Sequence, residues 1–99
     1  MNLIPLKLLT IIFNEALEES LLEGLDQLGV KSYTLYPVNG SPEGIRINDH
    51  AEENLKIQAL LNPELAEKVL SHLSEHYFGH YSVVAYLTPA EVLRGSKYT

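Results

Sequence analysis

The sequence contains no cysteine, and this absence excludes several kinds of chemistry. Without thiols the chain has no disulfide, no thiol nucleophile and no cysteine-based metal site. Positive charge is also scarce: seven lysines and arginines stand against thirteen aspartates and glutamates, which gives a net charge of −6. Because an acidic surface repels phosphate backbones, the composition argues against nucleic acid as a partner.

Long apolar runs are absent as well. The run at residues 8–13 is too short to cross a bilayer, and the first seven residues lack the basic region and cleavage site of a signal peptide. The 99 residues are enough for one domain and too few for two, so we expect a single domain over residues 1–99. We also expect a cytoplasmic protein.

Apolar spacing and helix-capping signals divide the chain into six main elements. A helix is expected between the capping Asn14 and the terminating Gly29, and a second one beginning at Asn62-Pro63. Pro37 is expected to end the regular pairing of the second strand, and Pro89 to end the last strand, with a short terminal element after it. The four strands are predicted at residues 6–13, 30–36, 55–61 and 81–87.

This order is β-α-β-β-α-β, which predicts an α+β fold of the ferredoxin-like type. Right-handed crossovers place both helices on one face of an antiparallel sheet. The first strand is apolar on both sides, and Val84 and Tyr86 add apolar side chains to the face that the helices leave open. Because a bare apolar sheet would be a large exposed patch, we expect a second subunit to cover it.

The connection at residues 37–54 is long and rich in glycine, proline, asparagine and charge. Long loops in small domains are often functional. It carries Arg46, which together with Arg94 makes up all the arginine of the chain, and a guanidinium can clamp a phosphate or carboxylate through two hydrogen bonds. The alternative is that both arginines are solvated or paired with surface acids. Backbone N–H groups near Gly40, Ser41 and Gly44 can add to an anion site, or simply form turns.

Three histidines recur at a spacing of four: His72, His76 and His80. Neutral imidazoles four residues apart on a helix can bind zinc or copper. Alternatively, His76 is a half-buried residue beside the apolar stripe and His80 lies in a turn after Gly79. The main prediction is that there is no metal site, and His72 with His76 is the alternative.

Four segments together resemble a known family. Residues 28–40 (LGVKSYTLYPVNG) resemble the stretch of PII signalling proteins that leads into their long T-loop. Residues 54–57 (NLKI), 66–69 (AEKV) and 91–95 (EVLRG) resemble PII-like proteins associated with bicarbonate transporters and carboxysomes. The resemblance covers nearly the whole chain, in the right order.

The resemblance implies a homotrimer that binds an adenine nucleotide or small anion in clefts between subunits. Such a protein is regulatory and not an enzyme, and its T-loop, here residues 37–54, docks on a partner. That partner is often a membrane transporter, which links the family to inorganic-carbon uptake and brings a cytoplasmic protein to the membrane. The implied ligand-binding residues are Gly40, Ser41, Arg46 and Arg94. The implied partner-binding residues are Pro42, Glu43, Gly44, Ile45 and Ile47.

The sequence also departs from the family. The glycine-lysine phosphate-binding loop is absent, because only Gly79 and His80 separate the second helix from the last strand. One of two arginines expected near the T-loop base is missing, and Val83 stands where relatives have a glycine. Two alternatives therefore stay open: an interaction module that has lost its ligand, and a metal-binding trimer similar to the CutA family that uses His72 and His76.

Overall fold

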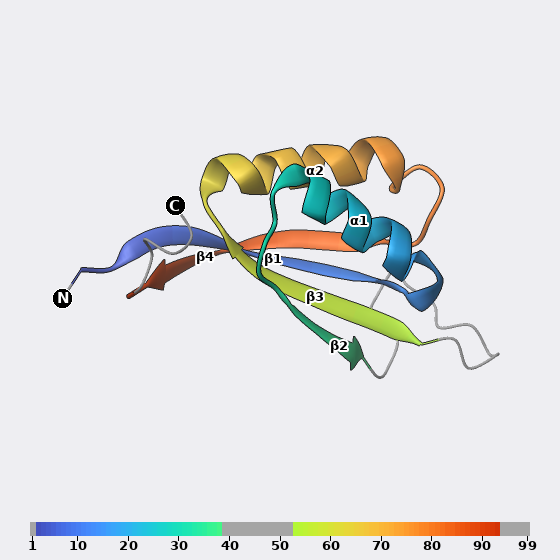
Figure 1. Cartoon of the computed structure of the whole chain (residues 1–99), viewed down its shortest axis with the longest axis horizontal. Coiled ribbons are helices and arrows are strands. Elements are labelled where there is room, and N and C mark those ends of the chain that lie inside the picture. The colour runs from blue at the N-terminus through green and yellow to red at the C-terminus, as the bar shows by residue number, and fades with distance from the viewer. Residues whose placement is uncertain (1, 39–52, 94–99) are drawn as a thin grey trace.

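The computed structural model describes residues 2–38 and 53–93, which form a four-stranded sheet with two helices on one face (Figure 1). The strand order is β2-β3-β1-β4, and every neighbouring pair is antiparallel. This is the predicted α+β ferredoxin-like fold. The elements are β1 (Ile4–Asn14), the 3₁₀ helix η1 (Glu15–Leu17), α1 (Glu18–Leu28), β2 (Thr34–Val38), β3 (Asn54–Leu61), α2 (Pro63–His76) and β4 (Val84–Val92).

The core lies between the sheet and the helices. Alternate residues of a strand point to the same face, and in β1 the side chains of Leu9, Ile11 and Phe13 are fully buried against the helical layer. Leu25 of α1 and Leu73 of α2 are fully buried in the same cluster. Burial of this apolar surface is what fixes both helices on one side of the sheet. No helix in the described part of the chain is both long enough and apolar enough to cross a membrane.

The predicted caps are confirmed. The Asn14 side chain accepts a hydrogen bond from the Ala16 N–H at 2.8 Å, and the Asn62 side chain accepts one from the Leu65 N–H at 2.9 Å. Gly29 ends α1 with a φ of 104°, a left-handed conformation that glycine adopts without strain. These local signals set where η1 begins, where α1 ends and where α2 begins.

The second strand differs from the prediction at both ends. It begins at Thr34 and not at Val30, because the Val30 N–H donates to the Leu25 carbonyl at 3.0 Å and completes the end of α1. Pro37 does not end the pairing either: it lies inside β2, opposite Leu55. β2 is an edge strand, and an edge strand tolerates a residue that lacks an N–H.

The last strand also differs from the prediction. It covers Val84–Val92, whereas residues 77–83 form a turn in which the Tyr81 N–H donates to the Tyr77 carbonyl at 2.9 Å. Pro89 does not break β4 but pairs with Lys7 of β1, again on an edge strand. The predicted terminal element is therefore, as far as Val92, a continuation of this strand.

The face of the sheet opposite the helices is more polar than expected. A row across it joins Tyr36, Gln58 and Thr10: the Tyr36 hydroxyl donates to Gln58 Oε1 at 2.9 Å, and Gln58 Nε2 donates to Thr10 Oγ1 at 3.4 Å. Beyond Thr10, the row ends on Tyr86 of β4, which is 45% exposed. The open face thus combines a hydrogen-bonded row with exposed aromatic surface.

Candidate functional site

The ligand-binding residues predicted from the sequence lie outside the described residues. Gly40, Ser41 and Arg46 fall in residues 39–52, together with the predicted partner-binding residues Pro42, Glu43, Gly44, Ile45 and Ile47. Arg94 falls in residues 94–99. What the structure does describe is the framework from which both segments leave the sheet.

The base of the loop lies where β1 and β2 end and β3 begins. Val38 and Asn14 both pair with Asn54, and the Glu15 N–H donates to the Glu53 carbonyl at 2.9 Å. The two ends of the predicted loop are therefore neighbours, joined through the backbone. The chain therefore leaves the sheet after Val38 and returns to it at Asn54 at the same end of the sheet.

Asn54 was not predicted as a site residue, and its environment is unusual. Asn54 is only 1% exposed, and among residues 2–38 and 53–93 its Nδ2 atom has no hydrogen-bond partner. A buried amide donor without an acceptor costs on the order of 1–3 kcal/mol. Such an atom often marks a place that a water, an ion or a ligand fills. The only signal in the sequence was its position, at the end of the loop predicted at residues 37–54.

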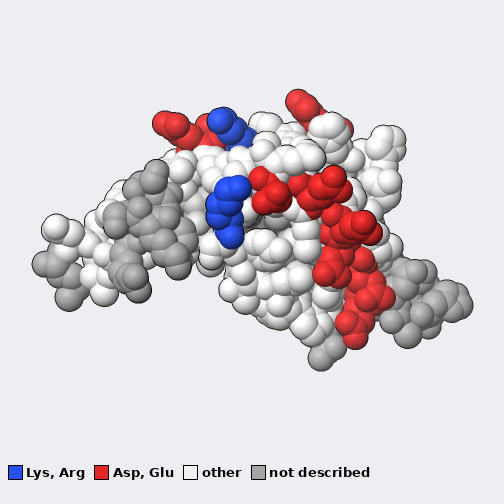
Figure 2. Space-filling model, viewed as in Figure 1, with Lys and Arg blue, Asp and Glu red and all other residues white. Residues whose placement is uncertain are grey.

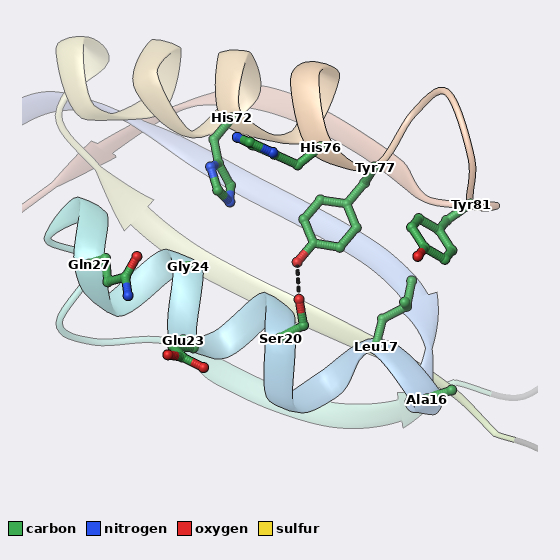
Figure 3. A pocket seen from close by; sticks show the side chains of 10 residues that line it. All are labelled: Ala16, Leu17, Ser20, Glu23, Gly24, Gln27, His72, His76, Tyr77 and Tyr81. Atoms are coloured by element: carbon green, nitrogen blue, oxygen red, sulfur yellow. Dashed lines mark hydrogen bonds between the residues drawn. The ribbon is translucent and has the colours of Figure 1, made fainter.

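A groove of ≈ 570 Å³ lies between the two helices on the outer side of the molecule (Figure 3). Polar and aromatic side chains line it. At its floor Ser20 Oγ of α1 and the Tyr77 hydroxyl lie 2.6 Å apart and share a hydrogen bond. Figure 3 shows the His72 ring reaching from α2 toward α1 beside Gly24. The lining residues are Ala16, Leu17, Ser20, Glu23, Gly24, Gln27, His72, His76, Tyr77 and Tyr81.

The structure brings two of the three spaced histidines together. The rings of His72 and His76 have centroids 4.6 Å apart, whereas α2 ends at His76 and leaves His80 in the following turn. Within residues 2–38 and 53–93, no group of three or more histidine, cysteine, aspartate or glutamate side chains could hold a metal ion. His72 and His76 alone supply two of the four ligands that a structural zinc site requires.

Electrostatics around the groove disfavour a charged His72. The pKa of His72 is lowered from 6.5, first by burial and then by the neighbouring imidazole of His76, while Glu75 acts in the opposite direction. Acidic side chains form a band across this face of the molecule (Figure 2), and α1 contributes Glu18, Glu19, Glu23 and Asp26 to the acidic surface. Basic side chains are sparse on the same face (Figure 2).

Comparison with known proteins adds the family context. Residues 6–97 match the family described as nitrogen regulatory protein P-II. A PII-like signalling protein from Thermus thermophilus is 41% identical, with a TM-score of 0.84 and 100% of each chain covered. CPII from Thiomonas intermedia, bound to ADP, AMP and acetate, is 31% identical, with a TM-score of 0.84 over 99% of this chain and 98% of that one. A second structure of CPII, bound to ADP, AMP and bicarbonate, is 28% identical, with a TM-score of 0.85 over 98% and 96% of the two chains.

Proposed function

The chain belongs to the nitrogen regulatory protein P-II family and is a PII-like regulatory protein, and from this premise we propose that it binds an adenine nucleotide together with a small carboxylate-like anion. The observation that carries the proposal is the match to CPII, which was solved with ADP and AMP and with acetate or bicarbonate. The same matches favour the PII-like interpretation over the CutA-like alternative. The proposal assigns the chain no catalytic residue.

The loop base is the proposed place for the anion. Acetate and bicarbonate present oxygen acceptors, and the unpartnered Nδ2 of Asn54 is a buried donor at this end of the sheet. Gly40 and Ser41 would add backbone donors, and Arg46 a bidentate guanidinium. Arg94 would complete the nucleotide cleft from a neighbouring subunit.

The cleft requires a trimer, and the open face of the sheet supports self-association. Tyr86 is exposed there beside the row of Thr10, Gln58 and Tyr36. An aromatic ring next to satisfied polar groups is typical of protein interfaces. We propose that three copies bury this face in a closed ring.

The partner-contacting arm of the proposal is the T-loop. Its predicted contact residues are Pro42, Glu43, Gly44, Ile45 and Ile47. The proposed partner is a bicarbonate transporter or another membrane transporter, which the trimer would approach from the cytoplasm. In this proposal, the occupied cleft controls how the loop meets that partner.

Calorimetric titration tests the ligand. ATP, ADP, AMP and cyclic AMP are titrated into the wild type with and without bicarbonate, and then into the R46A and R94A variants. Each arginine contributes charge-assisted hydrogen bonds, so its loss should weaken binding roughly tenfold or more. The matched control is K31A, which removes a positive charge whose side chain is 78% exposed.

The outcomes separate the parts of the proposal. If R46A and R94A both bind the nucleotide as tightly as the wild type, the assignment of these two arginines to the cleft is refuted, whereas nucleotide binding by the protein stands. N54D should bind the nucleotide normally but lose the effect of bicarbonate, because the new carboxylate repels the anion. This result would support the loop base as the anion site. A wild type that binds none of these ligands would favour the interaction module that has lost its ligand.

A further inference from the structure

His72 lies at the seam, which is the line along which α1 and α2 face each other (Figure 3). It lines the groove of ≈ 570 Å³ described above, and it also lines a second depression of ≈ 620 Å³ further along the seam. That second depression is bordered by Leu28 at the end of α1 and by Lys68 and Glu75 of α2. His72 is thus common to the linings of both hollows.

The position of the ring depends on a glycine. A Cβ placed on Gly24 would lie only 2.7 Å from His72 Nε2, closer than real Cβ contacts come. Gly24 is buried inside α1, where glycine weakens a helix relative to alanine by about 1 kcal/mol. The absence of a side chain at this point is what lets the imidazole pack against the backbone of α1.

The titratable groups that line the two hollows together with His72 come from both helices and the following turn. They are Glu23 of α1, and Glu64, Glu67, Lys68, Glu75 and His76 of α2. The rings of Tyr77 and His76 lie 6.1 Å and 4.6 Å away, and Tyr81 lines the same groove. In the described part of the chain, no hydrogen bond involves the His72 side chain.

We propose that the His72 side chain forms a partition between the two hollows, and that protonation of its imidazole opens this partition. In its neutral form the imidazole packs against Gly24 and keeps the two hollows apart. When it takes a proton from solvent, both ring nitrogens become donors. The nitrogen that faces Gly24 then carries a charge that must be hydrated while it lies in tight contact with the backbone of α1, and the ring swings out of the seam. The hydrogen bond between Ser20 and Tyr77 still holds the helices together, so the two hollows join without the fold opening.

Such a partition would link the shape of the helical layer to mildly acidic pH. His76 strengthens the response, because a second imidazole at 4.6 Å opposes the charge on the first, whereas Glu75 weakens it. The device lies on the helices and not at the loop base. It therefore operates whether or not a nucleotide binds.

NMR on the full-length protein tests this. At about pH 7.5 we expect a nuclear Overhauser effect between the His72 ring protons and Gly24 Hα, and its loss as the imidazole titrates with a midpoint below 6.5. The Gly24 amide resonance should shift with the same midpoint. In the H72Q variant this shift should disappear, and in the matched control H80Q, altered in the exposed turn, it should remain.

Two results would overturn the proposal. One is an Overhauser effect that persists in the protonated protein, which would mean that the ring stays in the seam. The other is a Gly24 titration that H72Q leaves unchanged, which would assign the response to another group. Should H72Q fail to fold, the Overhauser series on the wild type decides between the two states by itself.

Discussion

Ser20 Oγ and the Tyr77 hydroxyl lie 2.6 Å apart, and this bond joins two residues that are separated by 57 positions in the sequence. Tyr77 is the C-cap residue that follows α2, and only 5% of it is exposed. Its ring packs in the core while its hydroxyl reaches across to α1 (Figure 3). One side chain therefore anchors the helix end to the core and ties it to the neighbouring helix.

This tie can be measured with a double-mutant cycle. Removing either hydroxyl, in S20A or Y77F, should lower the free energy of unfolding by about 1 kcal/mol. The double variant should cost less than the sum of the two, because the second change removes a partner that is already unbonded. Denaturant unfolding of the four proteins checks this. Strict additivity would mean that the two hydroxyls do not interact.

Gly24 offers a test in which the sign of the effect changes. In the wild type, G24A gains helix propensity but places a methyl group 2.7 Å from His72 Nε2, so the net effect should be destabilising. In an H72A background the obstacle is gone, and the same substitution should raise the free energy of unfolding by about 1 kcal/mol. Thermal and denaturant unfolding report both. If G24A stabilises the wild type, the contact between Gly24 and His72 can accommodate a methyl group, and this prediction is wrong.

Stability should fall as the pH drops below 6.5. Above this value His72 is neutral in both the folded and the unfolded chain. Below it, the unfolded chain takes up a proton before the folded one, because the pKa of His72 is lowered in the folded state. The loss is complete once the pH is below the folded pKa. Melting curves between about pH 7.5 and pH 5.5 should show a smaller acid-side loss for H72Q than for the wild type. Equal losses would assign the effect to other groups.

Self-association through the open sheet face should be sensitive to charge. Light scattering of the wild type should give about three times the chain mass if the assembly closes as a ring. Y86K places a charge on the exposed face and should yield a smaller species. The matched control is Y33K, which is similarly exposed (41% against 45%) but lies outside the strands. A monomeric wild type would contradict the trimer, and a trimeric Y86K would move the interface elsewhere.

The helix ends show what short-range information can determine. Asn14, Gly29 and Asn62 act on backbone groups within a few positions of themselves, so their effect can be read without knowing the rest of the fold. The apolar character of the first strand on both of its faces likewise indicates its place at the centre of the sheet, where the structure has it. These signals are sufficient to predict the order of the elements and the α+β class.

The two prolines show where such information fails. The sequence predicts that Pro37 and Pro89 end strands, yet both lie inside one. A proline lacks one donor, and whether this matters depends on whether that side of the strand has a neighbour. β2 and β4 are edge strands, which is a property of the assembled sheet.

The sequence by itself determined the elements, their order and the family resemblance, because periodicity and capping depend on residues within a few turns of one another. The tertiary structure alone decided which side chains meet. Asn54 became a candidate ligand residue only because its buried amide has no hydrogen-bond partner in the part of the chain that the structure describes. Helix propensity alone would make Gly24 a weak point of α1, and the structure shows instead that its missing side chain makes room for the His72 imidazole. Such contacts depend on how two helices lie against each other over a shared core, and no local pattern encodes that packing.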